Sequence, residues 1–204
     1  MQKSVYDVII NGDNIKDTVV STDFHNLSLC PSNIDLAGAE IELVSENNRE
    51  YLLKNAVNVI KNDYDYIIID CPPSLGLLTL NSFVCADSII IPIQCEYYAL
   101  EGLSQLTNTI RKIKQTFNPE LEIEGVLLTM YDTRTNLSVQ VANEVKKYYG
   151  KKLYKSVIPR NVRLSEAPSF GQPINVYDKH SKGCACYMSL ASEVINNNKK
   201  RGGA

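Results

Sequence analysis

The chain has 204 residues, of which 44% are hydrophobic and 22% are charged, and these proportions are ordinary for a folded globular protein. A formal net charge of −2 excludes a protein-wide basic field, so any contact with nucleic acid requires a local cationic patch. No apolar run approaches the length of a membrane span, and residues 1–20 lack the apolar core of a signal peptide.

Short apolar runs recur along the chain and predict β-strands. The expected strands are residues 27–30, 66–70, 88–93, 122–130 and 153–158. Several of these runs carry apolar residues on both faces, a pattern typical of parallel strands covered by helices.

The segments between the strands carry apolar residues every three or four positions, which predicts amphipathic helices. The expected helices lie within residues 49–61, 100–117, 137–148 and 184–194. Alternation of strands and helices predicts an α/β fold, an open and mostly parallel sheet flanked by helices. We expect one domain over residues 1–195, followed by a polar, frayed tail at 196–204.

The six cysteines are expected to be reduced thiols packed as small apolar side chains. Cys184 and Cys186 lie close in sequence, but no second pair stands at metal-ligand spacing. Their expected place is a helix interior. His25 and His180 have no residues near them in sequence at the spacing of a catalytic triad or a metal site. They are expected to be surface or packing residues.

Ligands of open α/β sheets bind at the carboxyl ends of the strands, so the residues that follow each strand carry the most information. Asp70 ends an Ile-Ile-Ile run and is placed to reach Mg²⁺ directly or through a water molecule. Pro72 and Pro73 then fix the backbone, and Ser74 is a candidate N-cap for a helix that begins near Leu75. On pattern alone, a strand end with an N-capping aspartate is an equally good interpretation of Asp70.

Five ordered segments carry a resemblance to a known family. They are PSNIDLAGAEIEL (31–43), DYIIIDCPPSLG (65–76), PIQCEYYALEGL (92–103), TMYDTRTNLS (129–138) and IPRNVRLSEAPSFGQPI (158–174). With these segments the chain resembles, from residue 4 to about 195, the ParA/Soj family of chromosome- and plasmid-partition ATPases. The fold that the resemblance implies is a P-loop NTPase-like α/β sheet, in agreement with the alternation of strands and helices.

The family's nucleotide site begins with a glycine-rich loop that cradles phosphates at a helix N-terminus. None of the ten glycines opens a G-x-x-x-x-G-K-[ST] pattern. The sequence is therefore interpreted as a family member without its first β-α-β segment, and the chain alone is expected to be a poor ATPase. The sequence indicates no catalytic residue, and only the resemblance to the family implies binding of ATP and Mg²⁺.

The resemblance implies roles for several of the residues that follow strands. Asp70 and Pro72 are expected at the nucleotide. Other residues match family positions that pack around the adenine, namely Met130, Pro159, Arg160 and Asn161. Glu96 follows a strand and is expected in a nucleotide-sensing switch segment, although a solvated carboxylate before a helix is an equally good interpretation.

Arg134 and Arg163 resemble family arginines that contact DNA without sequence preference. Together with further cations they are candidates for a local basic surface, formed with Arg160, Lys146, Lys147, Lys151, Lys152 and Lys155. For the lysines, a solvated helix end that complements the helix dipole is the alternative interpretation.

The resemblance further implies a homodimer, a ParB/Spo0J-like partner protein, non-specific DNA as ligand, no membrane contact, and a cytoplasmic, nucleoid-associated protein. Three alternatives stay open: an ATP-incompetent interaction module, a membrane-binding cell-division positioning ATPase, and an iron–sulfur reductase. The polar residues after Ile195 disfavour the membrane alternative. Cys71 and Cys95 follow strands but show no cluster-ligand pattern, which disfavours the reductase.

Overall fold

The computed structural model describes residues 3–202. The chain divides into two compact units, and each is described by itself. The first unit comprises the chain up to Ser88 together with Thr109–Leu121, and the second comprises Ile89–Asn108 and the chain from Glu122 onwards. The assignment of residues 1–195 to one domain stays a prediction.

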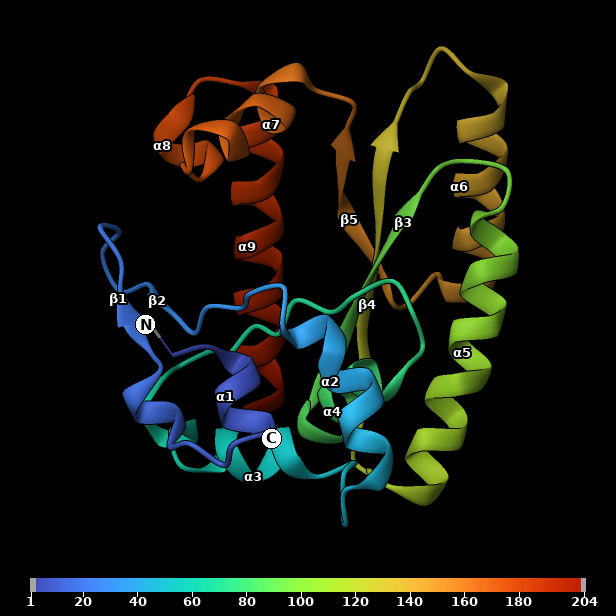
Figure 1. Cartoon of the computed structure of the whole chain (residues 1–204). Helices are drawn as coiled ribbons and strands as arrows, with labels where there is room; N and C mark the ends of the chain where they lie inside the picture. The colour runs from blue at the N-terminus through green and yellow to red at the C-terminus, as the bar shows by residue number, and fades with distance from the viewer. Residues whose placement is uncertain (1–2, 203–204) are drawn as a thin grey trace. The chain divides into compact units, whose positions relative to one another are not determined.

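The first unit consists mainly of short helices (Figure 1). The elements are α1 (Val5–Ile9), η1 (Ile15–Asp17), β1 (Val20–Ser21), β2 (Ser28–Leu29), α2 (Leu36–Glu42), η2 (Leu43–Ser45), α3 (Leu52–Asn58), η3 (Lys61–Asp63) and α4 (Leu77–Cys85). Buried apolar residues of α1, η2 and α3 pack together, among them Val8, Ile9, Leu43, Leu53 and Val57. The periodicity within 49–61 correctly predicted α3, in which Leu53 and Val57 are buried.

The predicted strand at 66–70 is wrong, because within the described residues this segment joins no sheet. Its backbone runs without regular structure, and Ile68 is 91% exposed. A strand exists only where a neighbouring strand accepts and donates hydrogen bonds, and an apolar sequence does not supply that neighbour. The predicted strand at 27–30 does form, as β2, but it pairs antiparallel with β1.

The N-terminus of α4 is capped by a residue that the sequence did not indicate. The predicted cap, Ser74, does not fill this role, and the N-cap position is Gly76. The carboxylate of Glu40, on α2, instead accepts the N–H groups of Leu77 at 2.7 Å and Leu78 at 3.2 Å. A negative charge at a helix N-terminus is favourable because it meets unpaired N–H groups and the positive end of the helix dipole.

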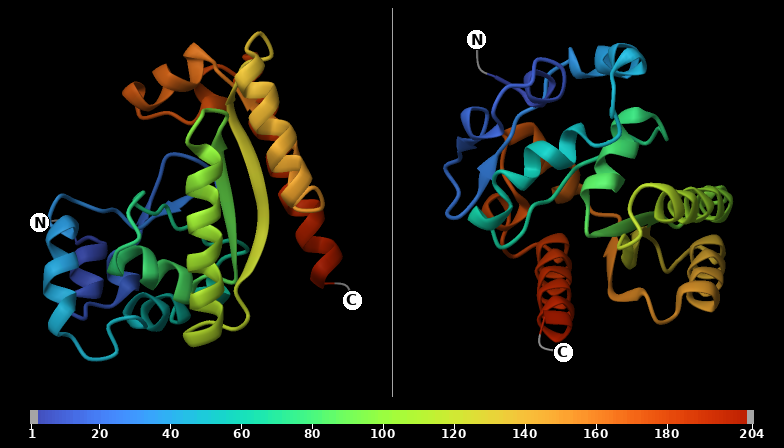
Figure 2. Two further views of the ribbon diagram at one scale, coloured as in Figure 1. Left: turned by 90° about the vertical axis from the view of Figure 1, so that its right-hand side faces the viewer. Right: turned by 90° about the horizontal axis from the view of Figure 1, so that it is seen from below.

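The second unit is an α/β layer built on a three-stranded sheet in the order β3-β4-β5. Its elements are β3 (Ser88–Gln94), α5 (Ala99–Thr116, which continues into the first unit), β4 (Glu122–Tyr131), α6 (Asn136–Tyr149), β5 (Leu153–Pro159), α7 (Val162–Glu166), η4 (Ala167–Phe170), α8 (Ile174–Tyr177) and α9 (Lys182–Gly202). β4 and β5 are parallel. α6 and α9 lie on opposite sides of these two strands (Figures 1 and 2). The predicted open α/β sheet flanked by helices is confirmed here.

Helix α9 also closes the outer edge of the sheet. Its Glu193 carboxylate accepts the N–H groups of Lys155 at 2.9 Å and Ser156 at 3.1 Å, both on β5. Cys184 is buried on this helix, which confirms its predicted place in a helix interior. The helix continues to Gly202, so residues 196–202, expected as a frayed tail, are helical, and 203–204 lie outside the described residues. Among the described residues, no helix combines the length and apolar character that a membrane crossing requires.

Candidate functional site

Pairing of β4 with β5 brings two of the predicted site segments together. Tyr131 lies opposite Pro159 in the parallel register, and the N–H of Arg160 donates to the carbonyl oxygen of Tyr131 over 3.4 Å. Met130, Pro159 and Arg160 therefore meet at the carboxyl ends of neighbouring strands, although 28 residues separate Tyr131 from Pro159 in the sequence. This is the part of an open α/β sheet where ligands bind.

Met130 has an unusual backbone conformation for a residue with a side chain. Its φ of 52° lies in the left-handed region, and the β4–β5 register shifts between Leu128 and Tyr131. Both features mark a bulge, which redirects a side chain at the end of a strand. Met130 is 38% exposed and lines a pocket, so the irregular backbone places an apolar residue at a cavity.

The pocket has a volume of about 800 Å³ and lies within the second unit. Three predicted site residues line it together: Glu96, Met130 and Arg160. Apolar side chains form much of the remaining wall, among them Ile91, Leu103, Leu106 and Leu137. An apolar cavity with a few charged groups at its border is the usual form of a small-molecule site.

Glu96 and Arg160, which both line the pocket, form an ion pair with each other. One Nη of Arg160 donates to the Glu96 carboxylate over 2.7 Å, and 64 residues separate the two in sequence. Both side chains are more than half exposed, so the pair adds little to stability. The pair instead fixes the position of two loops, because it links the loop after β3 to the loop after β5.

The two remaining residues of the predicted adenine loop have structural tasks. Pro159 is the last residue of β5. Asn161 is the N-cap of α7, and its side-chain oxygen accepts the N–H of Leu164 over 3.4 Å. The cap fixes the direction in which the chain leaves the strand.

Arg134 lies in the turn after β4 and binds the carboxylate of Asp132 through two parallel hydrogen bonds. Arg134 Nε donates to Oδ1 over 2.9 Å, and Nη2 donates to Oδ2 over 2.7 Å. These bonds, together with the N–H of Arg134, hold the pKa of the Asp132 carboxyl well below its usual range, and nearby Arg160 lowers it further. The Arg134 side chain is nevertheless 86% exposed.

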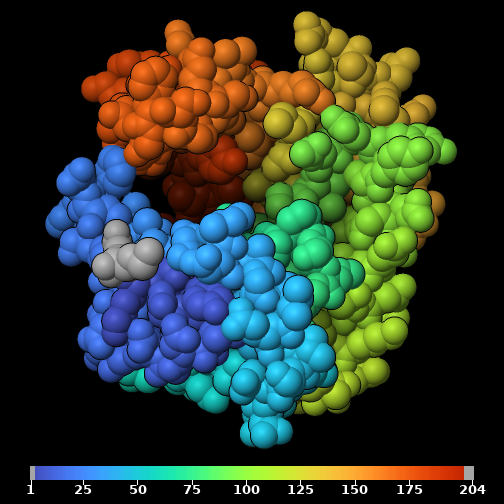
Figure 3. Space-filling view, in the orientation of Figure 1, coloured from blue at the N-terminus to red at the C-terminus, as the bar shows by residue number. Residues whose placement is uncertain are grey.

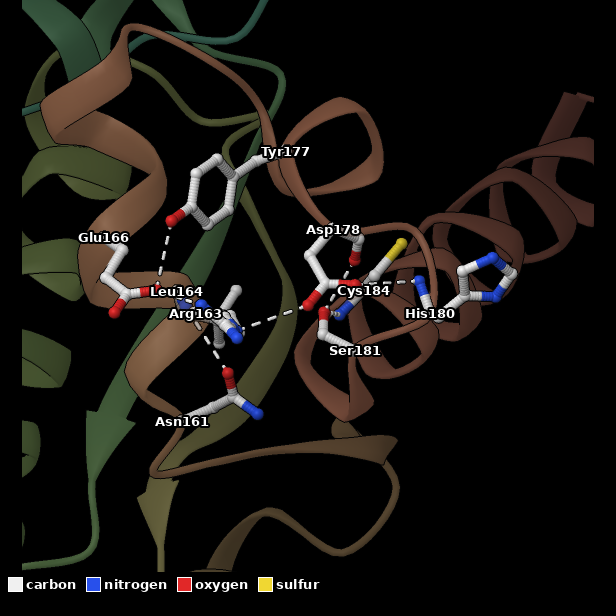
Figure 4. A network of polar contacts seen from close by, with 9 residues as sticks. All are labelled: Asn161, Arg163, Leu164, Glu166, Tyr177, Asp178, His180, Ser181 and Cys184. Atoms are coloured by element: carbon white, nitrogen blue, oxygen red, sulfur yellow. Dashed lines mark hydrogen bonds and ion pairs between the residues drawn. The ribbon is translucent and has the colours of Figure 1, made fainter.

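Arg163, the second arginine, lies on α7 within a polar network (Figure 4). Its Nη1 donates to Glu166 over 2.9 Å, and its Nε lies 3.4 Å from an oxygen of Asp178. The Tyr177 hydroxyl also donates to Glu166, over 3.1 Å. The hydrogen bonds from Arg163, and then from Tyr177, lower the pKa of Glu166. The segment from α7 to α8, shown in orange in Figure 3, lies at the surface with Arg163 exposed.

Asp70 and Pro72 belong to the first unit, and both are exposed. They lie in the irregular segment between η3 and α4. Their predicted place beside the residues of the second unit stays a prediction. An exposed carboxylate is nevertheless of the chemical type that Mg²⁺ prefers as a ligand.

The sequence did not indicate the carboxylates that bind the two arginines. Asp132 stands two residues before Arg134, and Glu166 stands three residues after Arg163, so close spacing of opposite charges was an available signal. Asp178 lies 15 residues beyond Arg163, and no local pattern connects the two.

Known proteins match this chain over most of its length. A family model described as "AAA domain" matches residues 1–123. The sporulation initiation inhibitor protein Soj of Bacillus subtilis is 57% identical over 97% of this chain and 78% of its own length. The chromosome partitioning protein ParA of Myxococcus xanthus is 53% identical over 94% of this chain and 68% of its own length.

Solved structures agree with these relatives. A crystal structure described as cobyrinic acid a,c-diamide synthase from Mycobacterium smegmatis is 37% identical and superposes with a TM-score of 0.81, covering 97% of this chain and 73% of that protein. The strand and helix arrangement is therefore that of an α/β P-loop-like protein. On the identities to Soj and ParA, the chain belongs to the ParA/Soj family of partition ATPases.

Proposed function

We propose that this chain acts in chromosome or plasmid partition as an ATPase of the ParA/Soj type, which dimerises with ATP and binds DNA without sequence preference. The observation that carries the proposal is the 57% identity to Soj over 97% of the chain. A ParB/Spo0J-like protein is the expected partner, and the nucleoid in the cytoplasm is the expected place of action.

The residues of this chain fit a nucleotide with Mg²⁺ in part. Met130 offers an apolar surface at the pocket, and Arg160 offers a cation there. Pro159 and Asn161 would shape the loop around the base, Pro72 would stiffen the loop after Asp70, and Asp70 would hold Mg²⁺ directly or through water. When bound, Mg²⁺ would neutralise phosphate charge. A crystal form of the M. smegmatis protein is described with ADP and magnesium, which supports the proposal.

DNA contact is proposed for Arg134 and Arg163. Both guanidinium groups are exposed, at 86% and 55% of their side-chain surface. Guanidinium groups bind phosphate oxygens through paired hydrogen bonds, and phosphate contacts carry no sequence information. Of the proposed lysines, Lys146 and Lys147 lie in the last turn of α6, where they also complement the helix dipole.

The test compares binding of the chain to two duplexes of unrelated sequence. Arg134→Ala and Arg163→Ala should weaken binding to both duplexes alike, while affinity for Mg²⁺–ATP stays unchanged. If the variants lost ATP binding and kept DNA binding, these arginines would contact the nucleotide and not the DNA. A change in preference between the duplexes would show contacts to base edges, and the non-specific assignment would be wrong.

A second candidate function is an interaction module of the same family that does not hydrolyse ATP. It is favoured by the sequence, in which no glycine opens a phosphate-loop pattern. Calorimetric titration with Mg²⁺–ATP separates the two candidates. The module should bind ATP weakly and hydrolyse it no faster than its Asp70→Ala variant, whereas micromolar binding that is lost with Asp70→Ala would identify a working site.

A further inference from the structure

Each arginine that the proposed function assigns to DNA already binds carboxylates of its own chain. Arg134 uses Nε and Nη2 to bind Asp132. Arg163 uses Nη1 for Glu166 and has its Nε beside Asp178. A phosphate oxygen would bind the same N–H groups, so a carboxylate and a phosphate compete for each guanidinium.

The carboxylates also cancel the charge that would attract a phosphate. Arg134 with Asp132 carries a net charge of zero, from one cation and one anion. Arg163 with Glu166 and Asp178 carries a net charge of −1, from one cation and two anions. Non-specific DNA binding depends on net positive charge facing the backbone. In the folded chain, neither arginine site has a net positive charge.

We propose that Asp132 and Asp178 mask the two arginines, and that DNA binds only as its phosphates displace these carboxylates. This inference rests on the proposed function, because it assumes that Arg134 and Arg163 contact DNA. The masks set how tightly the chain holds DNA, so that binding stays weak and reversible.

The geometry allows such an exchange. Both arginine side chains are more than half exposed, and the Asp132 and Asp178 side chains are partly exposed, at 16% and 31%. A phosphate can therefore reach each guanidinium from solvent, and ion pairs open to solvent are weak enough for a phosphate to replace a carboxylate. The two masks differ in strength. Arg134 binds Asp132 through two hydrogen bonds, of 2.9 and 2.7 Å, whereas the Nε of Arg163 lies 3.4 Å from Asp178. We therefore expect Asp132 to be the stronger mask.

Asparagine substitutions separate masking from folding. In each aspartate one oxygen accepts a backbone N–H: that of Arg134 for Asp132, and that of His180 for Asp178. An asparagine oxygen can accept the same hydrogen bond, so the turn is kept while the negative charge is removed. Glu101, an exposed carboxylate on α5 that accepts from Gln105, offers a matched control, because Glu101→Gln changes the net charge equally.

The experiment measures the affinity of the full chain for one fluorescent duplex at low ionic strength, for the wild type, Asp132→Asn, Asp178→Asn and Glu101→Gln. Each aspartate variant should bind about three- to fivefold more tightly than Glu101→Gln, as expected for release of one exposed ion pair. In a protein that also carries Arg163→Ala, Asp178→Asn should raise the affinity for the duplex no more than Glu101→Gln does, because the arginine that Asp178 masks is absent. Thermal melts check that all variants fold.

The outcomes separate this inference from the proposed function. If the arginine variants lose affinity but the aspartate variants match Glu101→Gln, the masking is wrong and the DNA assignment stands. If Asp178→Asn gains equally with and without Arg163, the effect is general electrostatics and the masking is again wrong. If the arginine variants bind as the wild type does, or no form binds, both the DNA assignment and the masking are overturned.

Discussion

Ion pairs hold the three arginines of the candidate site, Arg134, Arg160 and Arg163. Close spacing of opposite charges signals the contacts of Arg134 with Asp132 and of Arg163 with Glu166. The ion pair between Glu96 and Arg160 joins loops 64 residues apart, and chain folding alone creates it. Non-local pairs of this kind cannot be predicted from one sequence.

At this scale, the first prediction concerns the Asp132 carboxyl, whose pKa is lowered mainly by the side chain of Arg134. Since the folded-state pKa lies below the unfolded one, the pairing stabilises the fold at neutral pH and is lost as pH falls through the folded value. In an NMR titration that follows the carboxyl carbons, Asp132 should stay ionised at pH values at which ordinary aspartates are already protonated. Arg134→Ala should raise that pKa, and an identical titration in both proteins would contradict the assigned cause.

A second residue-scale prediction concerns Cys85 at the end of α4. Burial, with a smaller contribution from Asp87, raises the pKa of its thiol to about 11. The thiolate is the reactive form, so at about pH 8 Cys85 should react with a thiol reagent far more slowly in the folded than in the unfolded chain. Mass spectrometry of the labelled peptides measures both rates, and equal rates would show that the thiol is not buried.

Helices and strands differed in how well the sequence predicted them. Amphipathic periodicity is a local signal, and the helices predicted within 100–117 and 137–148 correspond to α5 and α6. The apolar runs at 88–93 and 122–130 formed β3 and β4, but the equally apolar run at 66–70 formed no strand among the described residues. A strand depends on a partner elsewhere in the chain, and composition does not report that partner.

An element-scale prediction follows from the cap of α4. Glu40→Ala should lower the free energy of unfolding by about 1 kcal/mol, because the N–H groups of Leu77 and Leu78 lose their acceptor. A Cβ on Gly76 would clash with the Glu40 carboxylate, so Gly76→Ala should displace the same carboxylate.

Urea unfolding of the two single variants and the double variant tests this cap. Because each change removes the same interaction, the Glu40 cap, the double variant should lose clearly less stability than the sum of the two single losses. Glu46→Ala, at an exposed position of the same unit, is the control and should cost little. Fully additive losses would show that Gly76 and Glu40 act independently.

For the whole molecule, the sequence predicted the fold class and the carboxyl ends of the strands as the place where site residues meet. The pocket shared by Glu96, Met130 and Arg160 agrees with that expectation. The left-handed backbone at Met130 was not predictable, because a methionine gives no signal for a positive φ. The contact of Arg163 with Asp178 was also not foreseen, since Asp178 lies at the end of α8, 15 residues further along the chain.

At the same scale, the exposed apolar segment 66–70 should promote association of the chain with itself. Exposed apolar segments that no strand of their own chain covers are sites of intermolecular association. Ile68→Ser should reduce the association measured by sedimentation velocity. Ile34→Ser is the matched control, because Ile34 is 86% exposed but lies in a turn. A wild-type chain that stays monomeric at every concentration would contradict this prediction.

The most direct test of the account is the salt dependence of DNA binding. The logarithm of the binding constant should fall linearly with the logarithm of salt concentration, and Arg134→Ala and Arg163→Ala should each flatten the slope by about one, the loss of one phosphate contact. Lys112→Ala, at an exposed position of α5 outside the proposed basic surface, is the control and should leave the slope nearly unchanged. If the arginine variants keep the wild-type slope, or the chain binds DNA without salt dependence, the assignment of these arginines to the DNA backbone is wrong.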